Sequence, residues 1–160
     1  MNDQSNHVGV KVGKTKILLV DDHTILREGL TLLINEEPDL VVCAEAQNAA
    51  EAQQVLKDHS VDLVILDITL GGTSGIQLTK KLKAKYPDLL ILILTMHDEA
   101  LYARRAFRAR ADGYITKHEA PEAIITAIHQ VLEGQKYISQ RMAAKIKDAE
   151  SFQSKQRGQQ

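Results

Sequence analysis

Acidic residues stand directly after two apolar runs of this sequence. The run at residues 63–66 ends at Asp67, and the run at residues 17–20 ends at Asp21 and Asp22. Apolar runs of this length are typical of strands buried on both faces, and open parallel sheets bind ligands at the carboxyl ends of their strands. One aspartate alone more often begins a turn, but three carboxylates at two such ends would repel one another. The pattern therefore predicts a site that holds a cation.

The residue types at these positions favour magnesium and phosphoryl chemistry. Oxygen ligands without histidine or cysteine favour a hard cation, and an open site with few carboxylates suits Mg²⁺ better than Ca²⁺. Because Mg²⁺ in such a site can also bind phosphate oxygens, we expect Asp67 to be a nucleophile that takes a phosphoryl group. Thr95 and Lys117 follow two further apolar runs, and we expect their side chains to hold the phosphoryl oxygens.

Apolar runs alternate with helical patterns through the middle of the chain. Runs typical of strands lie at residues 17–20, 40–44, 63–66, 89–94 and 114–116. Apolar residues at helical spacing follow each run and predict five helices, which begin near Thr24, Asn48, Ser74 or Gly75, Asp98 or Glu99, and Pro121, with Gly134 ending the last. Strands and helices in this alternation predict a doubly wound α/β domain with right-handed crossovers.

The two ends of the chain lack this alternation. We interpret residues 1–14 as a flexible leader, because they are polar and show no periodicity. We interpret residues 138–160 as a linker or tail, with a short helix near residues 142–146 and a disordered, glutamine-rich remainder.

Composition and charge exclude several classes of protein. A net charge of -1 gives no bulk attraction to nucleic acid or to an anionic membrane. The first residues lack the apolar core of a secretory signal, and the longest apolar run, at residues 89–94, is too short to span a bilayer. We therefore expect a cytoplasmic protein. Cys43 is the one cysteine and lies in an apolar run, which predicts a buried structural thiol.

Four segments of the sequence resemble the response-regulator receiver domain of two-component signalling. They are ILLVDDH at residues 17–23, VILDI at residues 64–68, Thr95, and DGYITK at residues 112–117. Each motif alone is weak, but their order and separations together are specific. The resemblance covers residues 15–137 and implies the flavodoxin-like (βα)5 receiver fold, a five-stranded parallel sheet with strand order 2-1-3-4-5. Residues 20–23 and 111–114 look most like the subgroup that carries a C-terminal LuxR-type helix-turn-helix.

The resemblance implies roles for individual residues. Asp67 would accept the phosphoryl group from a phosphohistidine of a sensor histidine kinase. The ligands of Mg²⁺ would be Asp21, Asp22, Asp67 and the backbone carbonyl of Thr69, while Thr95 and Lys117 would bind the phosphoryl oxygens. Thr95 and Tyr114 would form the switch, with Tyr114 moving inward as Thr95 is drawn toward the phosphoryl group. We expect His97, together with Thr69, to lie at the mouth of the pocket and to tune the access of water.

The resemblance also gives expectations about partners. We expect phosphorylation to promote a homodimer, through either the first and fifth helices or the fourth helix and fifth strand. Contact with DNA is expected only through an output domain absent from this chain, where it would control transcription, and no contact with a membrane is expected. We expect no enzymatic activity beyond self-phosphorylation and self-dephosphorylation at Asp67.

Other functions fit the sequence less well. A stand-alone receiver that acts by protein docking, or a degenerate receiver used only for dimerisation, would share this fold. An aspartyl phosphatase is disfavoured, because Thr69 stands where its general acid would be. A nucleotide-binding module is disfavoured, because no glycine-rich phosphate loop follows residues 17–20. We interpret His23 as the start of a helix rather than as a metal ligand.

Overall fold

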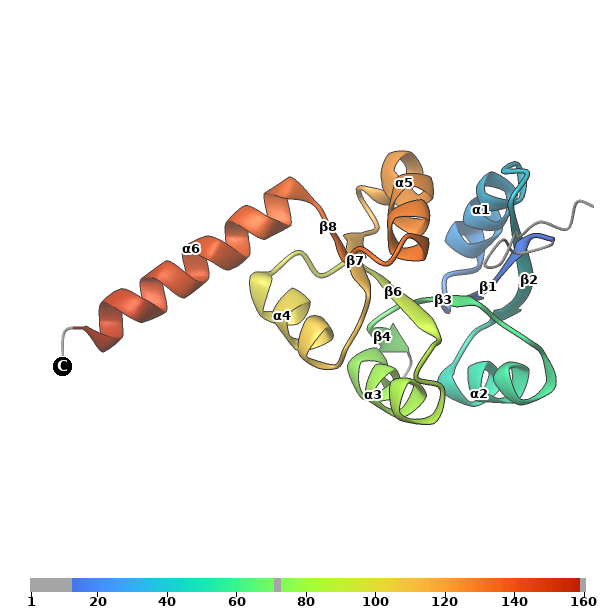
Figure 1. The fold of residues 1–160 in the computed structure, drawn as a ribbon, viewed down its shortest axis with the longest axis horizontal. Helices are drawn as coiled ribbons and strands as arrows, with labels where there is room; N and C mark the ends of the chain where they lie inside the picture. The colour runs from blue at the N-terminus through green and yellow to red at the C-terminus, as the bar shows by residue number, and fades with distance from the viewer. Residues whose placement is uncertain (1–12, 71–72, 159–160) are drawn as a thin grey trace, which may run out of the picture.

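A parallel sheet runs through the centre of the molecule, and helices cover both of its faces (Figure 1). The computed structural model describes residues 13–70 and 73–158, so most of the predicted flexible leader lies outside the described residues. The elements are β1 (Thr15–Val20), α1 (Thr24–Asn35), β2 (Leu40–Ala46), α2 (Ala49–Asp58), β3 (Leu63–Leu66), β4 (Thr69–Leu70), β5 (Thr73–Ser74), α3 (Gly75–Lys85), β6 (Leu90–Thr95), α4 (Ala100–Arg108), β7 (Gly113–Thr116), α5 (Ala120–Leu132), β8 (Tyr137–Ile138) and α6 (Gln140–Arg157).

The main sheet has the predicted order of strands and one strand more. Its order is β2-β1-β3-β6-β7-β8, and every neighbouring pair is parallel. The first five of these are the predicted strands in the predicted order 2-1-3-4-5, which confirms the doubly wound fold. The sixth, β8, was not predicted; Gly134, at φ 88°, turns the chain after α5, and Tyr137 then pairs with Gly113. A separate antiparallel pair, β4 and β5, follows Asp67.

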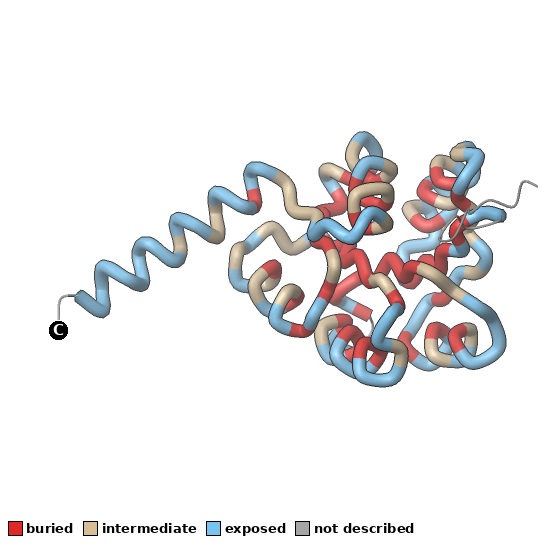
Figure 2. Tube along the Cα trace, viewed as in Figure 1, coloured by how far each residue is buried: buried red, intermediate tan, exposed pale blue. Residues whose placement is uncertain are grey.

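The core has two layers, one on each face of the sheet. On one face, α1 and α5 pack over alternate strand residues such as Ile17, Ile65 and Leu92. On the other face, α2, α3 and α4 pack over residues such as Leu18, Val64 and Ile91. Figure 2 shows that the central strands of the sheet form the buried centre of the molecule, while the edge strands are more exposed. Burial on both faces explains why β3 and most of β6 are unbroken apolar runs.

Most helices begin where the sequence predicts. The side chain of Asn48 caps α2 by accepting from the amide of Glu51, and Ser74 caps α3 by accepting from the amide of Ile76. The first helix begins at Thr24, where the sequence predicts it. Thr24 is already helical, and His23 occupies the cap position without a side-chain cap bond.

The prediction of a disordered tail is wrong for residues 147–157. They belong to α6, a helix of 18 residues that begins with Ser139 accepting from the amide of Met142. Its lysine, alanine, glutamine and glutamate residues have high helix propensity, which an interpretation based on polar composition overlooks. The first turns of α6 pack beside α4, and the rest of the helix projects away from the domain (Figures 1 and 2).

The expectation of a buried Cys43 is also wrong, because this cysteine is exposed. It lies on β2, which is an edge strand of the sheet and is only partly covered by helices. Among the described residues, no helix is both long enough and apolar enough to cross a membrane.

Candidate functional site

The carboxyl ends of three strands bring two carboxylates and an ammonium group together. Asp21 follows β1, Asp67 follows β3 and Lys117 follows β7. The Nζ atom of Lys117 lies 2.9 Å from Asp67 Oδ2 and 2.9 Å from Asp21 Oδ2. All three residues are buried. The sequence-based prediction that these side chains converge at one edge of the sheet is confirmed.

The acidic cluster offers oxygen ligands for a cation. One ligand atom each from Asp21, Asp22, His23 and Asp67 lies within 4.8 Å of the others. Asp21 Oδ2 is buried and accepts no hydrogen bond, so its contact with Lys117 is an undirected ion pair. The ammonium of Lys117 balances the charge of this oxygen but gives it no directed hydrogen bond, so the oxygen can still coordinate a metal. Three carboxylates at an open edge are a donor set that fits Mg²⁺.

The charge of Lys117 is stabilised by its two acidic neighbours. Burial is the largest influence and lowers the pKa of Lys117, but the hydrogen bond to Asp67 and the negative charges of Asp67 and Asp21 outweigh it. The pKa of Lys117 is therefore raised above its ordinary value. At neutral pH this side chain is a fixed positive charge beside Asp67.

The second carboxylate oxygen of Asp67, which does not face Lys117, is held by the backbone of Thr69. The amide of Thr69 donates to Asp67 Oδ1 at 3.2 Å, so both oxygens of the carboxylate are hydrogen-bonded. Thr69 itself is exposed, and its Oγ1 lies 3.3 Å from His97 Nε2. The ring of His97 stacks on Tyr102 with 4.2 Å between centroids. The structure thus places Thr69 and His97 in contact with each other beside Asp67.

The predicted switch residues meet at the backbone of His97. Thr95 is fully buried, and its Oγ1 accepts from the amide of His97 at 3.3 Å. Tyr114 is 1% exposed and its hydroxyl donates to the carbonyl of His97. Burial, followed by repulsion from Glu99 and Asp98, raises the pKa of Tyr114 well above its usual range. The hydroxyl is therefore a permanent donor at neutral pH.

Two residues near the site were not predicted as members of it. His23 is at the start of α1, as expected, but its Nδ1 also lies 2.9 Å from Asp21 Oδ1, 3.2 Å from Asp22 Oδ1 and 2.9 Å from Lys117 Nζ. Arg27 is buried; it donates from Nη1 to the backbone carbonyl of Asp21 and from Nε to Glu45 Oε1 at 2.9 Å. The sequence did contain a signal for the burial of Arg27. This residue lies three positions before Leu30, a helical spacing that places it on the buried face of α1.

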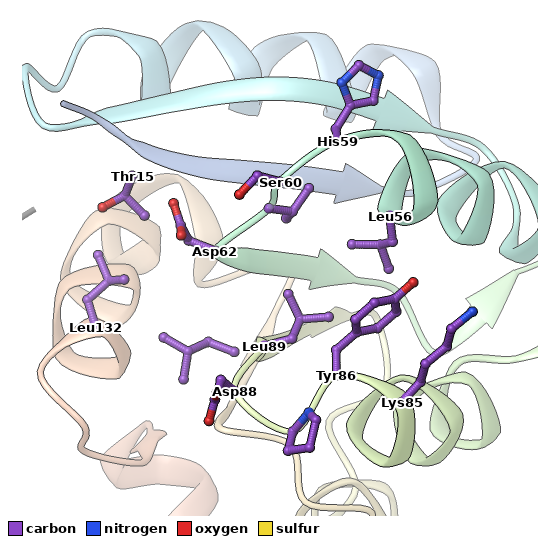
Figure 3. A pocket seen from close by; sticks show the side chains of 13 residues that line it. Thr15, Leu56, His59, Ser60, Asp62, Lys85, Tyr86, Asp88, Leu89 and Leu132 are labelled. Atoms are coloured by element: carbon purple, nitrogen blue, oxygen red, sulfur yellow. The ribbon is translucent and has the colours of Figure 1, made fainter. Parts of the chain in front are cut away.

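A large cavity among the described residues lies away from this site. It has a volume of about 790 Å³ and lies at the opposite edge of the sheet, where Thr15 begins β1 and Asp62 precedes β3 (Figure 3). Tyr86, Asp88 and Leu89 line it from the α3–β6 connection. None of its lining residues belongs to the acidic cluster.

Comparison with known proteins identifies the same segment of the chain. The family model described as the response regulator receiver domain matches residues 17–154. The oxygen regulatory protein NreC of Staphylococcus epidermidis is 35% identical over 132 residues, which cover 82% of this chain and 61% of NreC. The transcriptional regulatory protein DegU of Brevibacillus brevis is 30% identical over 138 residues, covering 86% of this chain and 56% of DegU. The chain thus spans about three fifths of the length of these curated relatives.

Solved structures agree with these relatives. A two-component response regulator of the LuxR family from Aurantimonas sp. SI85-9A1 has 37% sequence identity and a TM-score of 0.82, and the match covers 87% of this chain and 99% of that one. The isolated receiver domain of RcsB from Salmonella enterica serovar Typhimurium has 21% identity and a TM-score of 0.78, with 84% of this chain and 99% of that chain covered. The second likeness concerns the fold alone.

Proposed function

The chain belongs to the response regulator receiver domain family, and on that premise we propose that Asp67 is its phosphoacceptor. The observation that carries the proposal is the buried Lys117 ammonium, 2.9 Å from Asp67 and 2.9 Å from Asp21 at one edge of the sheet. A fixed cation beside a carboxylate favours the approach of an anionic phosphoryl group to that carboxylate.

The reaction we propose is transfer from a phosphohistidine of a sensor histidine kinase. A carboxylate oxygen of Asp67 forms a bond to phosphorus, and the bond between phosphorus and the histidine nitrogen breaks, so that an acyl phosphate and a free imidazole result. Lys117 pairs with the added negative charge, and the buried hydroxyl of Thr95 donates to a phosphoryl oxygen. Chemistry by this chain is limited to the gain and loss of the phosphoryl group at Asp67.

We propose that the ion of this site is Mg²⁺. Asp21, Asp22 and Asp67 would hold it through their side chains and Thr69 through its backbone carbonyl, and the unbonded Oδ2 of Asp21 supports this assignment. When bound, Mg²⁺ supplies charge neutralisation between the carboxylates and the phosphoryl oxygens. Arg27 fixes the backbone carbonyl of Asp21, and so orients the end of β1 toward the site.

The output that we propose is the control of transcription, through a DNA-binding portion of the protein beyond residues 1–160. Two observations support this part of the proposal. The chain covers only 61% of NreC and 56% of DegU, a transcriptional regulatory protein. The solved relative with 37% identity is described as a LuxR-family regulator.

Incubation with acetyl phosphate and Mg²⁺, followed by intact-mass measurement, tests the phosphoacceptor. We expect one phosphoryl adduct on the wild type, none on Asp67→Asn, and none when EDTA removes Mg²⁺. Asp22→Ala should require more Mg²⁺ for the same yield, because one ligand is lost. Asp88→Asn is the matched control, since this exposed aspartate lines the distant cavity and its variant should form the adduct normally. An adduct that persists in Asp67→Asn, or a wild type that forms none, would contradict the proposal.

A further inference from the structure

Positive charge is concentrated on two neighbouring helices, α3 and α4. Seven of the twenty lysine and arginine residues of the chain lie on them, and neither helix contains an aspartate or a glutamate. The rest of the chain therefore carries all twenty-one acidic residues and only thirteen lysines and arginines. The net charge of -1 is thus the sum of two unlike regions, and the region of α3 and α4 attracts anions.

The arginines of α4 project from the outer side of the helix. Ala103 and Ala106 are buried against the core, while Arg105 and Arg108, on the opposite side, are exposed. Arg104 is partly buried and, together with Arg108, lines a hollow of about 380 Å³ between α4 and α6. The outer side of α4 therefore presents guanidinium groups to the solvent.

The neighbouring helix α3 extends this positive region. The two helices contact each other on the same face of the sheet (Figure 1). Lys83 of α3 pairs with Asp112, which follows α4, so the side of α3 that carries Lys83 faces α4. Lys80 precedes Lys83 by one turn on that side and is exposed. We define the basic surface as Lys80, Arg104, Arg105, Arg108 and Arg110.

The cations of the basic surface do not hold the fold together. Among the described residues, no carboxylate pairs with any of these five side chains. Nearby acids have other partners, since Asp112 pairs with Lys83 and Asp98 pairs with Arg141. Glu150 of α6 lines the hollow and makes no ion pair with the arginines there. The basic surface is therefore available to an anion from outside the domain.

The stability of the helices does not account for these cations. Cations in the last turn of α4 complement the helix dipole, which explains Arg105 and Arg108 but neither Arg104 nor Lys80. Arg110 has a φ of 77°, a backbone conformation that favours glycine, and the chain nevertheless has an exposed arginine there. A residue that is unfavourable for the local backbone is often kept for an interaction of its side chain.

We infer that the basic surface binds the phosphate backbone of duplex DNA. Guanidinium groups match phosphate oxygens in geometry, and contacts to the backbone do not depend on the base sequence. The choice of DNA as the anion rests on the proposed output, the control of transcription. The resemblance implies a C-terminal DNA-binding portion, and such a portion would be joined through α6, which begins beside α4 (Figure 1). The inference goes beyond the expectation that DNA is contacted only through the output portion.

Fluorescence anisotropy of a labelled DNA duplex of arbitrary sequence, titrated with the 160-residue chain, tests the inference. We expect a dissociation constant of about 10⁻⁴ M at about 0.05 M salt. The logarithm of the association constant should fall with the logarithm of salt concentration with a slope of about -3, because about three to four phosphates are neutralised. Arg105→Gln and Arg108→Gln should each weaken binding about tenfold and reduce the magnitude of the slope by about one.

Lys16→Gln is the matched control, since it removes one positive charge from an exposed position on β1, away from α3 and α4. It should bind DNA within about twofold of the wild type, because it contacts no phosphate. The inference is overturned if the wild type does not bind the duplex, or if Arg105→Gln and Arg108→Gln bind it as tightly as Lys16→Gln does.

Sedimentation velocity of the chain without DNA tests the other possible occupant, an acidic face of a second copy. A salt-sensitive self-association that Arg108→Gln abolishes, with no binding of the duplex, would assign the basic surface to that contact and overturn the inference. The adduct on Asp67 of the wild type is measured separately by intact mass. An adduct without DNA binding overturns the inference and leaves the phosphoacceptor in place, whereas DNA binding without an adduct supports the inference and contradicts the phosphoacceptor.

Discussion

Lys117 shows how one buried side chain can depend on its neighbours for its charge. An isolated ammonium group in the interior would lose its proton or destabilise the fold, but here two carboxylates from other strand ends face it. The arrangement is reciprocal, since Asp21 and Asp67 would repel each other without the cation. The three residues therefore form one unit, and each was recognisable in the sequence because it directly follows an apolar strand.

Other members of the site could not be predicted from their positions in the sequence. The partners of Arg27 are the carbonyl of Asp21 and the carboxylate of Glu45 on β2, and only the folded chain brings α1 and β2 together. The approach of the His23 ring to Lys117 joins residues 94 positions apart. Contacts of this kind depend on the rotamers and on the exact course of the β1–α1 loop, which a pattern of residue types does not contain.

The buried hydroxyl of Tyr114 predicts a loss of stability at alkaline pH. Its pKa is raised above the ordinary value of 10.0, chiefly by burial. As pH rises above 10, the unfolded state releases this proton and the folded state keeps it. Stability therefore falls with pH, by up to about 1.4 kcal/mol per pH unit for one proton. The contribution of the Tyr114 hydroxyl to stability is complete below the pKa of this group in the unfolded state, and it is lost as the pH rises above that pKa.

The variant Tyr114→Phe isolates this effect. It lacks the hydrogen bond to His97, so we expect it to be about 0.5–1.5 kcal/mol less stable than the wild type at neutral pH. Urea unfolding at several pH values should show that this difference narrows between about pH 9 and about pH 11, since phenylalanine has no proton to lose. A difference that stays constant over this range would show that Tyr114 ionises normally in the folded protein.

At the scale of elements, the start of α3 is packed directly against the backbone that carries Asp67. A Cβ atom at Gly75 would lie 2.2 Å from the carbonyl oxygen of Asp67 and 2.7 Å from Cα of Ile68. Real Cβ atoms do not approach backbone atoms so closely, so α3 would have to move away. Glycine at this position therefore allows the start of α3 to pack directly against the loop that follows β3.

We expect Gly75→Ala to destabilise the domain by about 1–3 kcal/mol and to slow the formation of the acetyl phosphate adduct, because the Asp67 loop is displaced. Gly29→Ala is the matched control. A Cβ atom at Gly29, in the middle of α1, meets nothing within 4 Å, so this change should stabilise the helix by about 0.5–1 kcal/mol and leave the adduct unchanged. Thermal unfolding measures the stability of the two variants. Equal changes in stability for Gly75→Ala and Gly29→Ala would disprove the packing argument.

The elements that could be predicted are those with long apolar runs or clear periodicity in the sequence. β1, β3 and β6 have long apolar runs, and their order in the sheet agrees with the resemblance stated from the motifs. β4, β5 and β8 have two residues each, too few to show any periodicity. Only the part of α6 near residues 142–146 was predicted, because only the first turns carry apolar residues that reach α4, while the polar remainder resembles a disordered segment.

At the scale of the whole molecule, the two layers of helices leave different surfaces exposed. α1 presents Ile25 and Leu32, which are 87% and 70% exposed, on either side of Gly29 along one face of the helix. α4 exposes Leu101 to a lesser extent, and part of its surface is beside α6. Of the two interfaces considered for a homodimer, the structure therefore favours the one that includes α1.

We predict that phosphorylation promotes self-association through α1. In a two-fold symmetric dimer each copy contributes Leu32, so Leu32→Glu removes two apolar contacts and places two carboxylates in the interface. Since burial of one leucine contributes about 1.5–3 kcal/mol, we expect the dissociation constant of the phosphorylated form to rise at least about tenfold. Sedimentation velocity at matched concentration, with and without acetyl phosphate, measures it. Leu101→Glu on α4 should leave the dimer intact; if it disrupts the dimer and Leu32→Glu does not, the interface lies on α4 and β7 instead.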